Sequence, residues 1–284
     1  MEVHKSPSID KRAVLITGCS SGIGLAAANT LHSRGFQVYA TARKPPDVEK
    51  LRQSGLQSML LDLTDPLSIE NALAEVLHAT NGKLYGLFNN GGFGQGGAVE
   101  DLPTAALREQ FETLVFGWHE LTRRVIPVMR AQGYGRIVQN SSVLGFAAMP
   151  YRGAYNAAKF AIEGLSDTLR LELRGSNIHV SIIQPGPIRS KFRENGQARF
   201  HRHINAADSV HASHYEHTLA RLNSAGDASK FTLGPDAVVD KLLHALQHHS
   251  PRARYRVTTP TIAFAIAKRI LPVSLLDRIL AAIH

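Results

Sequence analysis

Tyr155 and Lys159 stand four residues apart in the sequence. On a helix this spacing places both side chains on one face, one turn apart. The pKa of a free tyrosine is about 10, which is too high for a base at neutral pH. A neighbouring ammonium group favours the phenolate, so we expect it to lower the pKa of Tyr155 toward neutrality. The pair could transfer a proton to or from a substrate oxygen, although this spacing also arises often by chance.

Ser142 follows the apolar run Arg136-Ile137-Val138-Gln139 and precedes Tyr155 by thirteen residues. If the run is a strand of a parallel sheet, its carboxyl end borders the crevice in which ligands bind. Ser142 could then hydrogen bond to the same substrate oxygen as Tyr155. The alternative is a serine that forms a turn or caps a helix.

A glycine-rich turn, Thr17-Gly18-Cys19-Ser20-Ser21-Gly22-Ile23-Gly24, separates an apolar run from a helix-like segment. Gly18 permits a tight turn, Gly22 permits close approach of a pyrophosphate, and Gly24 permits packing of the helix on the sheet. The helix N-terminus offers free N–H groups to phosphate. A purely structural turn is the alternative. We expect the turn to bind a dinucleotide through Gly18, Ser20, Ser21, Gly22, Ile23 and Gly24.

The segment Thr41-Ala42-Arg43-Lys44 ends the second strand-like run and contains no acidic residue. An Asp or Glu here would bind the ribose 2′-hydroxyl of NAD and would repel a 2′-phosphate. Arg43 can form a charge-assisted fork to that phosphate, and Lys44 adds charge. The alternative is an ordinary solvated basic turn. The sequence favours NADP(H) as the cofactor.

Strand-like and helix-like patterns alternate along the chain, which is typical of a parallel sheet covered on both faces. We predict an α/β, Rossmann-type, doubly wound and mostly parallel seven-stranded sheet. The predicted strands are 13–17, 36–41, 56–61, 84–88, 136–139, 179–183 and 254–257. The predicted helices are 24–33, 66–79, 103–132, 154–174 and 235–249. We expect a single domain over residues 1–257 and an apolar helical extension over 258–284.

The amino-acid composition is that of a globular protein from a reducing compartment. Hydrophobic residues make up 44% and charged residues 19% of the 284 residues, as in globular proteins. A single cysteine, Cys19, excludes an internal disulfide and fits a reducing compartment. The polar segment 1–12 lacks the apolar core of a secretory signal, and no apolar run reaches the ~20 residues that span a bilayer. We expect a cytoplasmic protein.

The net charge of +9 raises the question of an anionic partner. The Lys and Arg residues are scattered, without a compact basic run interleaved with aromatic residues. This pattern argues against nucleic-acid binding. A phosphorylated dinucleotide or a membrane surface is a better match to the charge.

The ordered motifs resemble those of the short-chain dehydrogenase/reductase superfamily, and the resemblance covers nearly the whole chain. They comprise the glycine turn, Asn89-Asn90-Gly91-Gly92, Ser142, the Tyr155/Lys159 pair, and Pro185-Gly186. The wider sequence is similar to NADP-dependent aldehyde reductases and to 17-beta-hydroxysteroid and retinol dehydrogenases. The resemblance implies that Tyr155 is the general acid/base. It also implies that Ser142 polarises the substrate oxygen and that Lys159 binds the nicotinamide ribose and lowers the pKa of Tyr155.

The same resemblance implies further cofactor contacts. Asp62, followed by Leu63, would lie beside adenine, and Asn90, Gly91 and Gly92 would lie near the cofactor at the central sheet. The nicotinamide carboxamide would meet Pro185, Gly186, Ile188 and Ser190. Hydride would pass between nicotinamide and a carbonyl or alcohol carbon. The family also implies a homodimer or homotetramer formed through the two long helices.

Two positions depart from the family pattern. Gly91 replaces the usual alanine, a change that adds backbone freedom. Leu114 stands where the family has an asparagine that is thought to hold a water in a proton relay from Lys159. Because leucine cannot hydrogen bond, we expect slower proton exchange rather than loss of activity. A non-catalytic protein that binds or senses NADP(H) is the alternative.

The C-terminal part bears on the substrate. Residues from about 190 to 231 occupy the place of a substrate lid and are rich in histidine, but positions 211, 214 and 217 drift around a helix, so we expect no metal site. Residues 258–284 carry an amphipathic apolar stripe with basic residues. The stripe could cover the substrate cleft, contact a neighbouring subunit, or contact a membrane surface. With Phe93, Phe146, Met149 and Tyr151 in nearby loops, it favours a small apolar carbonyl or alcohol substrate. A membrane-surface interaction protein on the same scaffold is a third hypothesis.

Overall fold

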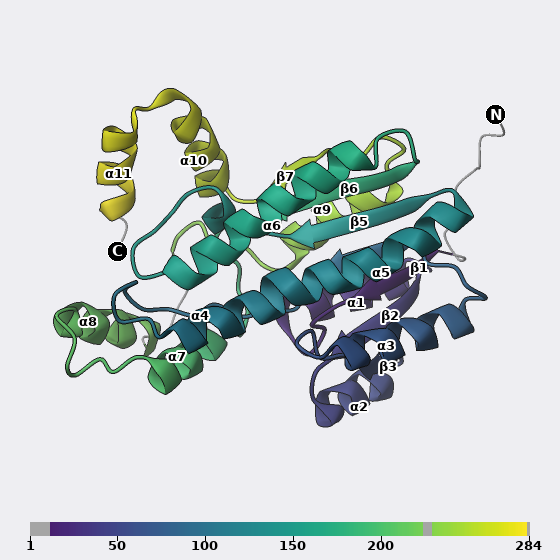
Figure 1. Cartoon of the computed structure of the whole chain (residues 1–284), viewed down its shortest axis with the longest axis horizontal. Helices are drawn as coiled ribbons and strands as arrows, with labels where there is room; N and C mark the ends of the chain where they lie inside the picture. Colours follow the sequence, from purple (N-terminus) through teal and green to yellow (C-terminus); the bar gives the residue numbers. More distant parts are fainter. Residues whose placement is uncertain (1–11, 224–228, 283–284) are drawn as a thin grey trace.

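The computed structural model describes residues 12–223 and 229–282 of the chain. Its centre is a seven-stranded sheet in the order β3-β2-β1-β4-β5-β6-β7, in which every neighbouring pair is parallel (Figure 1). The strands are β1 (Ala13–Ile16), β2 (Gln37–Ala42), β3 (Gln57–Leu60), β4 (Gly86–Asn89), β5 (Gly135–Asn140), β6 (Ile178–Gln184) and β7 (Arg254–Arg256). The predicted Rossmann-type fold is confirmed.

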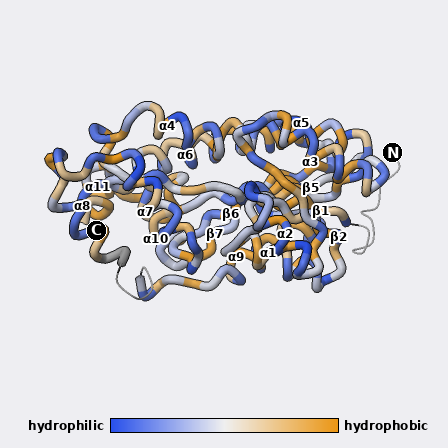
Figure 2. The backbone as a smooth tube through the Cα atoms, turned by 90° about the horizontal axis from the view of Figure 1, so that it is seen from below, coloured by the Kyte–Doolittle hydropathy of each residue, from blue (hydrophilic) through white to orange (hydrophobic). Residues whose placement is uncertain are grey.

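Alternation of side chains along each strand divides the core into two layers. In β1, Val14 and Ile16 pack with residues of α1 (Gly22–Ser33), α2 (Pro45–Gln53) and α9 (Asp236–Gln247). Ala13 and Leu15 point to the opposite face, because successive side chains of a strand alternate. That face is covered by α3 (Pro66–Ala79), α5 (Gly117–Gln132) and α6 (Gly153–Glu172). Figure 2 shows hydrophobic residues along β1 and β5, as expected for strands buried on both faces.

Three helical regions differ from the sequence-based expectation. α2 was not predicted, because its nine residues bury only Val48 and Leu51. The predicted helix 103–132 is divided into α4 (Thr104–Phe111), a π-helical turn at Glu112–Phe116, and α5. The polar region after β6 contains α7 (Phe192–His203) and α8 (Ala212–Asn223). Phe200 is the single buried residue of α7, so an apolar periodicity is missing there. Residues 224–228 of the expected lid lie outside the described residues.

The chain ends in α10 (Thr259–Ile270) and α11 (Val273–Ala281), which form a pair at one end of the molecule (Figure 1). Their inner side packs on the loop after β5, where Leu280 and Phe264 join a cluster with Val143 and Ala147. Their outer side exposes apolar residues that follow helical spacing, namely Ile262, Ile266, Ile270, Val273, Leu275 and Ile279. Among the described residues, none of the helices is both long and apolar enough to span a membrane. The last two residues of the predicted extension, 283 and 284, lie outside the described part.

Candidate active site

Ser142, Tyr155 and Lys159 come together beyond the carboxyl end of β5. Tyr155 and Lys159 lie in the first two turns of α6, and both are buried. The Ser142 hydroxyl lies beside the Tyr155 phenol and acts to lower its pKa. It also accepts a hydrogen bond of 3.1 Å from the Leu144 amide, which starts a short 3₁₀ turn. Ser142 therefore caps the short turn, and its hydrogen bond to a substrate oxygen stays a prediction.

The phenol of Tyr155 is held in its protonated form in this structure. Burial raises the pKa of Tyr155 above its ordinary value, while the Ser142 hydroxyl and the charge of Arg152 act in the opposite direction. Desolvation penalises a phenolate that has few polar partners. This direction differs from the lowered pKa expected from sequence. A protonated, buried phenol is suited to donate a proton.

Lys159 is buried and faces three other residues of the site. Its Nζ donates a hydrogen bond of 2.6 Å to the Asn140 carbonyl oxygen at the end of β5. Nζ also lies 4.3 Å from the ring centroid of Trp118 and 5.5 Å from that of Tyr155. Burial lowers the pKa of Lys159 to about 7, and the charge of Glu163 opposes this shift. The ammonium group therefore titrates near neutral pH.

The glycine turn is packed so closely that side chains are excluded from it. Gly18 has φ +72°, and a Cβ atom there would lie 2.5 Å from the Gly91 Cα. A Cβ atom on Gly24 would lie 2.2 Å from the Gly18 carbonyl oxygen, so a glycine at this position lets the helix approach the turn closely. α1 begins at Gly22, two residues earlier than predicted, with Ser20 and Ser21 before it and Ile23 in its first turn. The cradle fits a dinucleotide phosphate at a helix N-terminus.

Asn90 links the glycine turn to the centre of the sheet. Its Nδ2 donates to the Thr17 carbonyl oxygen at 3.0 Å and to that of Gly18 at 3.2 Å. The Asn90 and Gly91 amides both donate to the Thr17 hydroxyl, each at 2.9 Å. These bonds fix the position of the turn against β4.

The residues expected near adenine and its ribose lie after β2 and β3. The Cys19 amide donates a hydrogen bond of 2.7 Å to the Thr41 carbonyl oxygen, which brings the end of β2 against the glycine turn. Arg43 and Lys44 follow and are exposed. Beyond β3, Asp62 Oδ1 accepts hydrogen bonds from the amide and the hydroxyl of Thr64, at 2.9 and 2.8 Å. Leu63 is buried and borders the Gly91 backbone.

The segment after β6 spans the space between the catalytic candidates and the glycine turn. The Val143 amide donates a hydrogen bond of 2.7 Å to the Pro185 carbonyl oxygen. Gly186 faces Thr258, and Ser190 lies against Gly22. Ile188 forms a parallel bridge with Leu233, the residue that also bonds to Arg189. Pro185 therefore lies beside the Ser142 loop and Ser190 beside the glycine turn, while the contacts of Gly186 and Ile188 with a cofactor stay a prediction.

Leu114 is buried in the π-helical turn, where its side chain reaches Gly92. One turn further along, Trp118 lies against Lys159, and its Nε1 donates a hydrogen bond of 2.9 Å to the Gly91 carbonyl oxygen. Trp118 was missed from sequence, although it is the single tryptophan of the chain and follows Leu114 at helical spacing.

The region of the expected lid places one aromatic ring beside Tyr155 and makes further ring contacts with Tyr151. The Phe192 ring, at the start of α7, meets the Tyr155 ring edge-on at a centroid distance of 5.3 Å. The His214 ring stacks on Tyr151 at 3.7 Å, and His211 Nε2 lies 2.6 Å from a Glu100 carboxylate oxygen. Among the described residues no group of His, Cys, Asp or Glu is arranged to hold a metal ion.

Cys19 lies inside the glycine turn with its side chain buried. Burial raises the pKa of its thiol to about 12, and Sγ contacts the Ile16 carbonyl oxygen at 3.3 Å. Because the thiolate is the reactive form, such a cysteine is inert at neutral pH.

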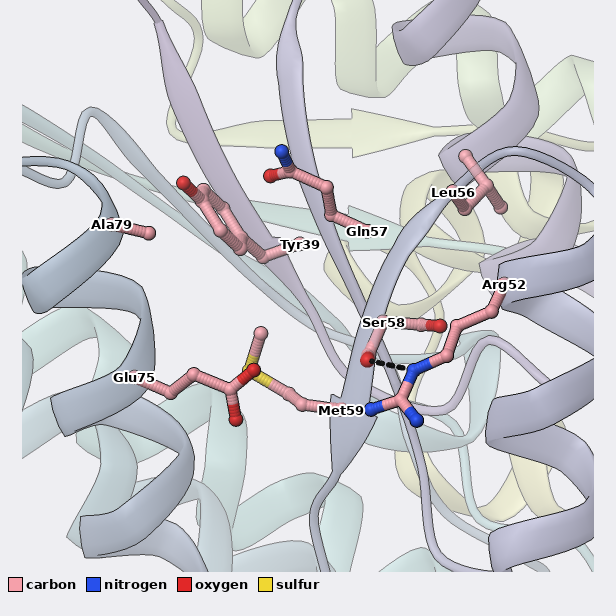
Figure 3. A pocket seen from close by; sticks show the side chains of 8 residues that line it. All are labelled: Tyr39, Arg52, Leu56, Gln57, Ser58, Met59, Glu75 and Ala79. Carbon is pink, nitrogen blue, oxygen red and sulfur yellow. Dashed lines mark hydrogen bonds between the residues drawn. The ribbon is translucent and has the colours of Figure 1, made fainter.

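A surface pocket of about 260 Å³ lies elsewhere, at the outer edge of the sheet (Figure 3). It is lined by Tyr39 of β2, by Gln57, Ser58 and Met59 of β3, and by residues of α2 and α3. The Arg52 Nε atom donates to the Ser58 carbonyl oxygen at 3.1 Å across one wall. The pocket lies beside β3 rather than beyond the carboxyl ends of β4 and β5, so it is separate from the candidate active site.

A model of the short chain dehydrogenase family matches residues 12–199. The chain therefore belongs to this family and is an oxidoreductase that acts on CH–OH or C=O groups. It is 45% identical over 270 residues to the uncharacterized oxidoreductase YbbO of Escherichia coli K12, covering 95% of this chain and 94% of that protein. It is 30% identical over 278 residues to the NADPH-dependent 3-dehydrocapnine reductase of Ornithobacterium rhinotracheale, covering 94% and 95%.

Solved structures have the same architecture. A short chain dehydrogenase/reductase from Burkholderia phymatum, in complex with NAD, is similar with a TM-score of 0.79 and 25% identity. The likeness covers 95% of this chain and 96% of that one.

Proposed function

We propose that the protein is an NADP(H)-dependent carbonyl reductase and alcohol dehydrogenase that acts on a small apolar aldehyde or ketone. The observation that carries the proposal is the place of Ser142 beside the Tyr155 phenol, with Lys159 one turn further along the same helix as Tyr155. Two hydroxyl groups that can donate to a substrate oxygen and one ammonium group thus lie near the glycine turn that would hold the dinucleotide.

The chemistry divides between cofactor and protein. A bound nicotinamide supplies the hydride, which carries the electron pair to the carbonyl carbon. As the carbonyl oxygen becomes an alkoxide, Tyr155 donates its phenolic proton to it, and an alcohol forms. Ser142 donates a hydrogen bond to the same oxygen and stabilises the developing charge. Lys159 stabilises the phenolate that remains and binds the nicotinamide ribose.

NADP(H) rather than NAD(H) is supported by the end of β2. Arg43 and Lys44 are exposed there, next to a glycine turn that is bonded to Thr41. A guanidinium group binds phosphate in a bidentate manner, whereas a ribose 2′-hydroxyl would call for a carboxylate acceptor. One relative is described as NADPH-dependent, in line with this preference. Asp62, Asn90 and the segment 185–190 would complete the cofactor contacts.

An apolar substrate is supported by the surroundings of Tyr155. Phe192 packs on its ring, and Phe146 and Met149 belong to the cluster that joins the loop after β5 to α10 and α11. These side chains offer few polar partners to a hydrophilic substrate. Burial of a hydrocarbon chain against them would stabilise the complex by about 0.8 kcal/mol per methylene group.

A panel of aliphatic aldehydes, retinal and ketosteroids tests the proposal, with NADPH consumption followed by absorbance. We expect turnover to rise with the length of the apolar chain. Tyr155→Phe should retain NADPH binding and lose about 10²- to 10⁴-fold in kcat, the range of general acid catalysis. NADPH binding without turnover on the whole panel would instead support a non-catalytic NADP(H) sensor.

Peripheral contact with an anionic lipid surface is a second proposal, favoured by the outer side of α10 and α11. Ile270 and Val273 are 72% and 73% exposed there, and Lys268, Arg269 and Arg278 lie on the same pair of helices. Apolar side chains with basic neighbours are typical of interfacial helices. Vesicles containing phosphatidylglycerol should co-sediment the protein, and Ile270→Asn should weaken this. Leu67→Asn, at an exposed apolar site in α3, is the matched control.

We also propose a homodimer or homotetramer that forms through α5 and α6. Phe160 and Leu171 are exposed on α6, and the space around Gly164 is open. Light scattering should give a mass of two or four chains. A bulky Gly164→Trp side chain should lower that mass, whereas a monomeric wild type would contradict the proposal.

A further inference from the structure

Besides its pairing with Tyr155, the Lys159 ammonium group makes two further contacts, one with an indole ring and one with a backbone carbonyl oxygen. Its Nζ is 4.3 Å from the centroid of the Trp118 ring and 2.6 Å from the Asn140 carbonyl oxygen. Lys159 and Trp118 are both almost fully buried. In such a desolvated place, attraction between an ammonium group and an indole face is at its strongest.

Trp118 is itself fixed at both ends. Its Nε1 donates a hydrogen bond of 2.9 Å to the Gly91 carbonyl oxygen, in the backbone that borders the glycine turn. Its ring packs in the core formed by α3, α5 and α6 with the sheet. The indole thus connects the dinucleotide cradle to the ammonium group of Lys159.

The neighbouring position explains why an indole is needed. Leu114, one turn before Trp118, is buried against Gly92 and offers no hydrogen bond. Of these two residues, only Trp118 can stabilise the charge of Lys159, through the face of its ring. We propose that Trp118 is a positioning residue for Lys159, which holds the ammonium group on its ring face and sets the pH at which that group is charged.

Other groups also act on the charge of Lys159. On α6, Tyr155 lies one turn before it and Glu163 one turn after it. The Glu163 carboxylate is shared, since Gln184 Nε2 donates to it at 2.9 Å and Arg254 Nε at 3.1 Å. On β5, the Asn140 carbonyl oxygen accepts from Nζ. Trp118 supplies the contact from α5. Because Glu163 is already engaged, weakening the indole contact should show directly in the titration of Lys159.

The chain contains one tryptophan, so Trp118 can be observed and altered selectively. The emission of the wild-type protein, followed from pH 5.5 to 9.5, should show a transition caused by Lys159, and Lys159→Met should abolish it. Biosynthetic replacement by mono-, di- and trifluorotryptophan withdraws electron density from the ring face with little change of size. The midpoint, read by ¹⁹F NMR, should fall stepwise by a total of about one pH unit. The corresponding limb of the kcat/KM profile should move with it.

If Trp118 had only a structural role, its fluorination would alter the stability of the fold without moving the midpoint of the Lys159 titration. The inference is overturned if the transition persists in Lys159→Met, if the wild type shows none, or if fluorination leaves the midpoint unchanged. It rests on the proposed role of Lys159, but the titration needs no substrate. Failure of the proposed function would appear instead in the substrate panel, so the two failures are distinguishable.

Discussion

Asn140 Nδ2 donates a hydrogen bond of 2.8 Å to Asn90 Oδ1. This bond joins the ends of β5 and β4, and each partner has a second task. Asn90 holds the glycine turn through the Thr17 and Gly18 carbonyl oxygens, and the Asn140 carbonyl oxygen holds Lys159. The position expected for phosphate and the position of the ammonium group are therefore set by one connected network.

Arg43→Ala should raise the KM for NADPH about tenfold or more and leave the KM for NADH nearly unchanged. A charge-assisted hydrogen bond to a phosphate is worth about 1.5–3 kcal/mol, and 1.4 kcal/mol is tenfold in affinity. Arg130→Ala removes the same charge at an exposed site near the end of α5 and serves as the control. Steady-state kinetics with both cofactors gives the answer. Equal losses for NADPH and NADH would contradict the assignment of Arg43.

Lys159→Met should abolish most turnover yet increase thermal stability near neutral pH. Burial lowers the pKa of Lys159 to about 7 from the ordinary 10.5, so between these values the folded protein binds fewer protons than the unfolded chain. Wild-type stability should therefore rise with pH across this window. The Met variant has no ammonium group to titrate. Its Tm should therefore exceed that of the wild type by about 5 °C below pH 7, and this difference should shrink toward pH 10. Calorimetry at pH 6 and pH 9.5 tests this, and an equal advantage at both would contradict it.

Leu114→Asn should lower stability and accelerate proton exchange. The site is buried, so an amide without full hydrogen bonding costs about 1–3 kcal/mol. The polar group could also bind a water near Lys159 and assist proton movement, which would reduce the solvent isotope effect on kcat. Leu114→Met, which conserves volume and apolarity, is the control. Unchanged turnover and an unchanged pH profile in the Asn variant would show that the relay does not depend on this position.

Tyr215→Phe should loosen α7 and α8, which form the expected lid. The Tyr215 hydroxyl accepts a hydrogen bond of 2.8 Å from the Ala98 amide and donates to the Asp101 carboxylate, so α8 is attached to the loop before α4. Its loss should increase proteolysis within α7 and α8 about tenfold and raise KM for an apolar substrate more than it changes kcat. Tyr134→Phe, at the opposite end of the sheet, should have neither effect.

The same contact predicts how the lid responds to pH. Hydrogen bonds from Ser209 and Tyr215 lower the pKa of Asp101 below its ordinary value. The stabilisation that they give is therefore present above that ordinary value and is lost only as the pH falls through the lowered one. Limited proteolysis should give the same rate from pH 6 to pH 9, and a marked rise only below pH 4.

The sheet was predictable because its strands are continuous apolar runs between glycine-rich turns. Each of the seven predicted strands lies within two residues of the observed one. The less apolar helices were not predictable in this way. α7 buries only Phe200, and α2 is short and begins at two prolines, so neither presents the periodicity on which a sequence-based prediction depends.

The site was predictable to the extent that spacing within one element or the order of motifs determines it. The proximity of Tyr155 and Lys159 follows from helical geometry. The pKa direction of Tyr155 does not, because burial outweighs the neighbouring charges and burial depends on the folded surroundings. The contact between Trp118 and Lys159 joins residues from α5 and α6, and packing of these helices is what brings them together.

The hydrogen bond from the Val143 amide to the Pro185 carbonyl oxygen fixes the Ser142 loop to the segment expected beside nicotinamide. With both flanks of the reacting carbon held to one frame, a prochiral ketone would expose the same face to hydride in every turnover. The handedness of the alcohol would then depend on which side of Tyr155 accepts the larger substituent, and the Phe192 ring packs on one side of it. Chiral chromatography of the products from Phe192 variants would show how far this residue of α7 determines which enantiomer forms.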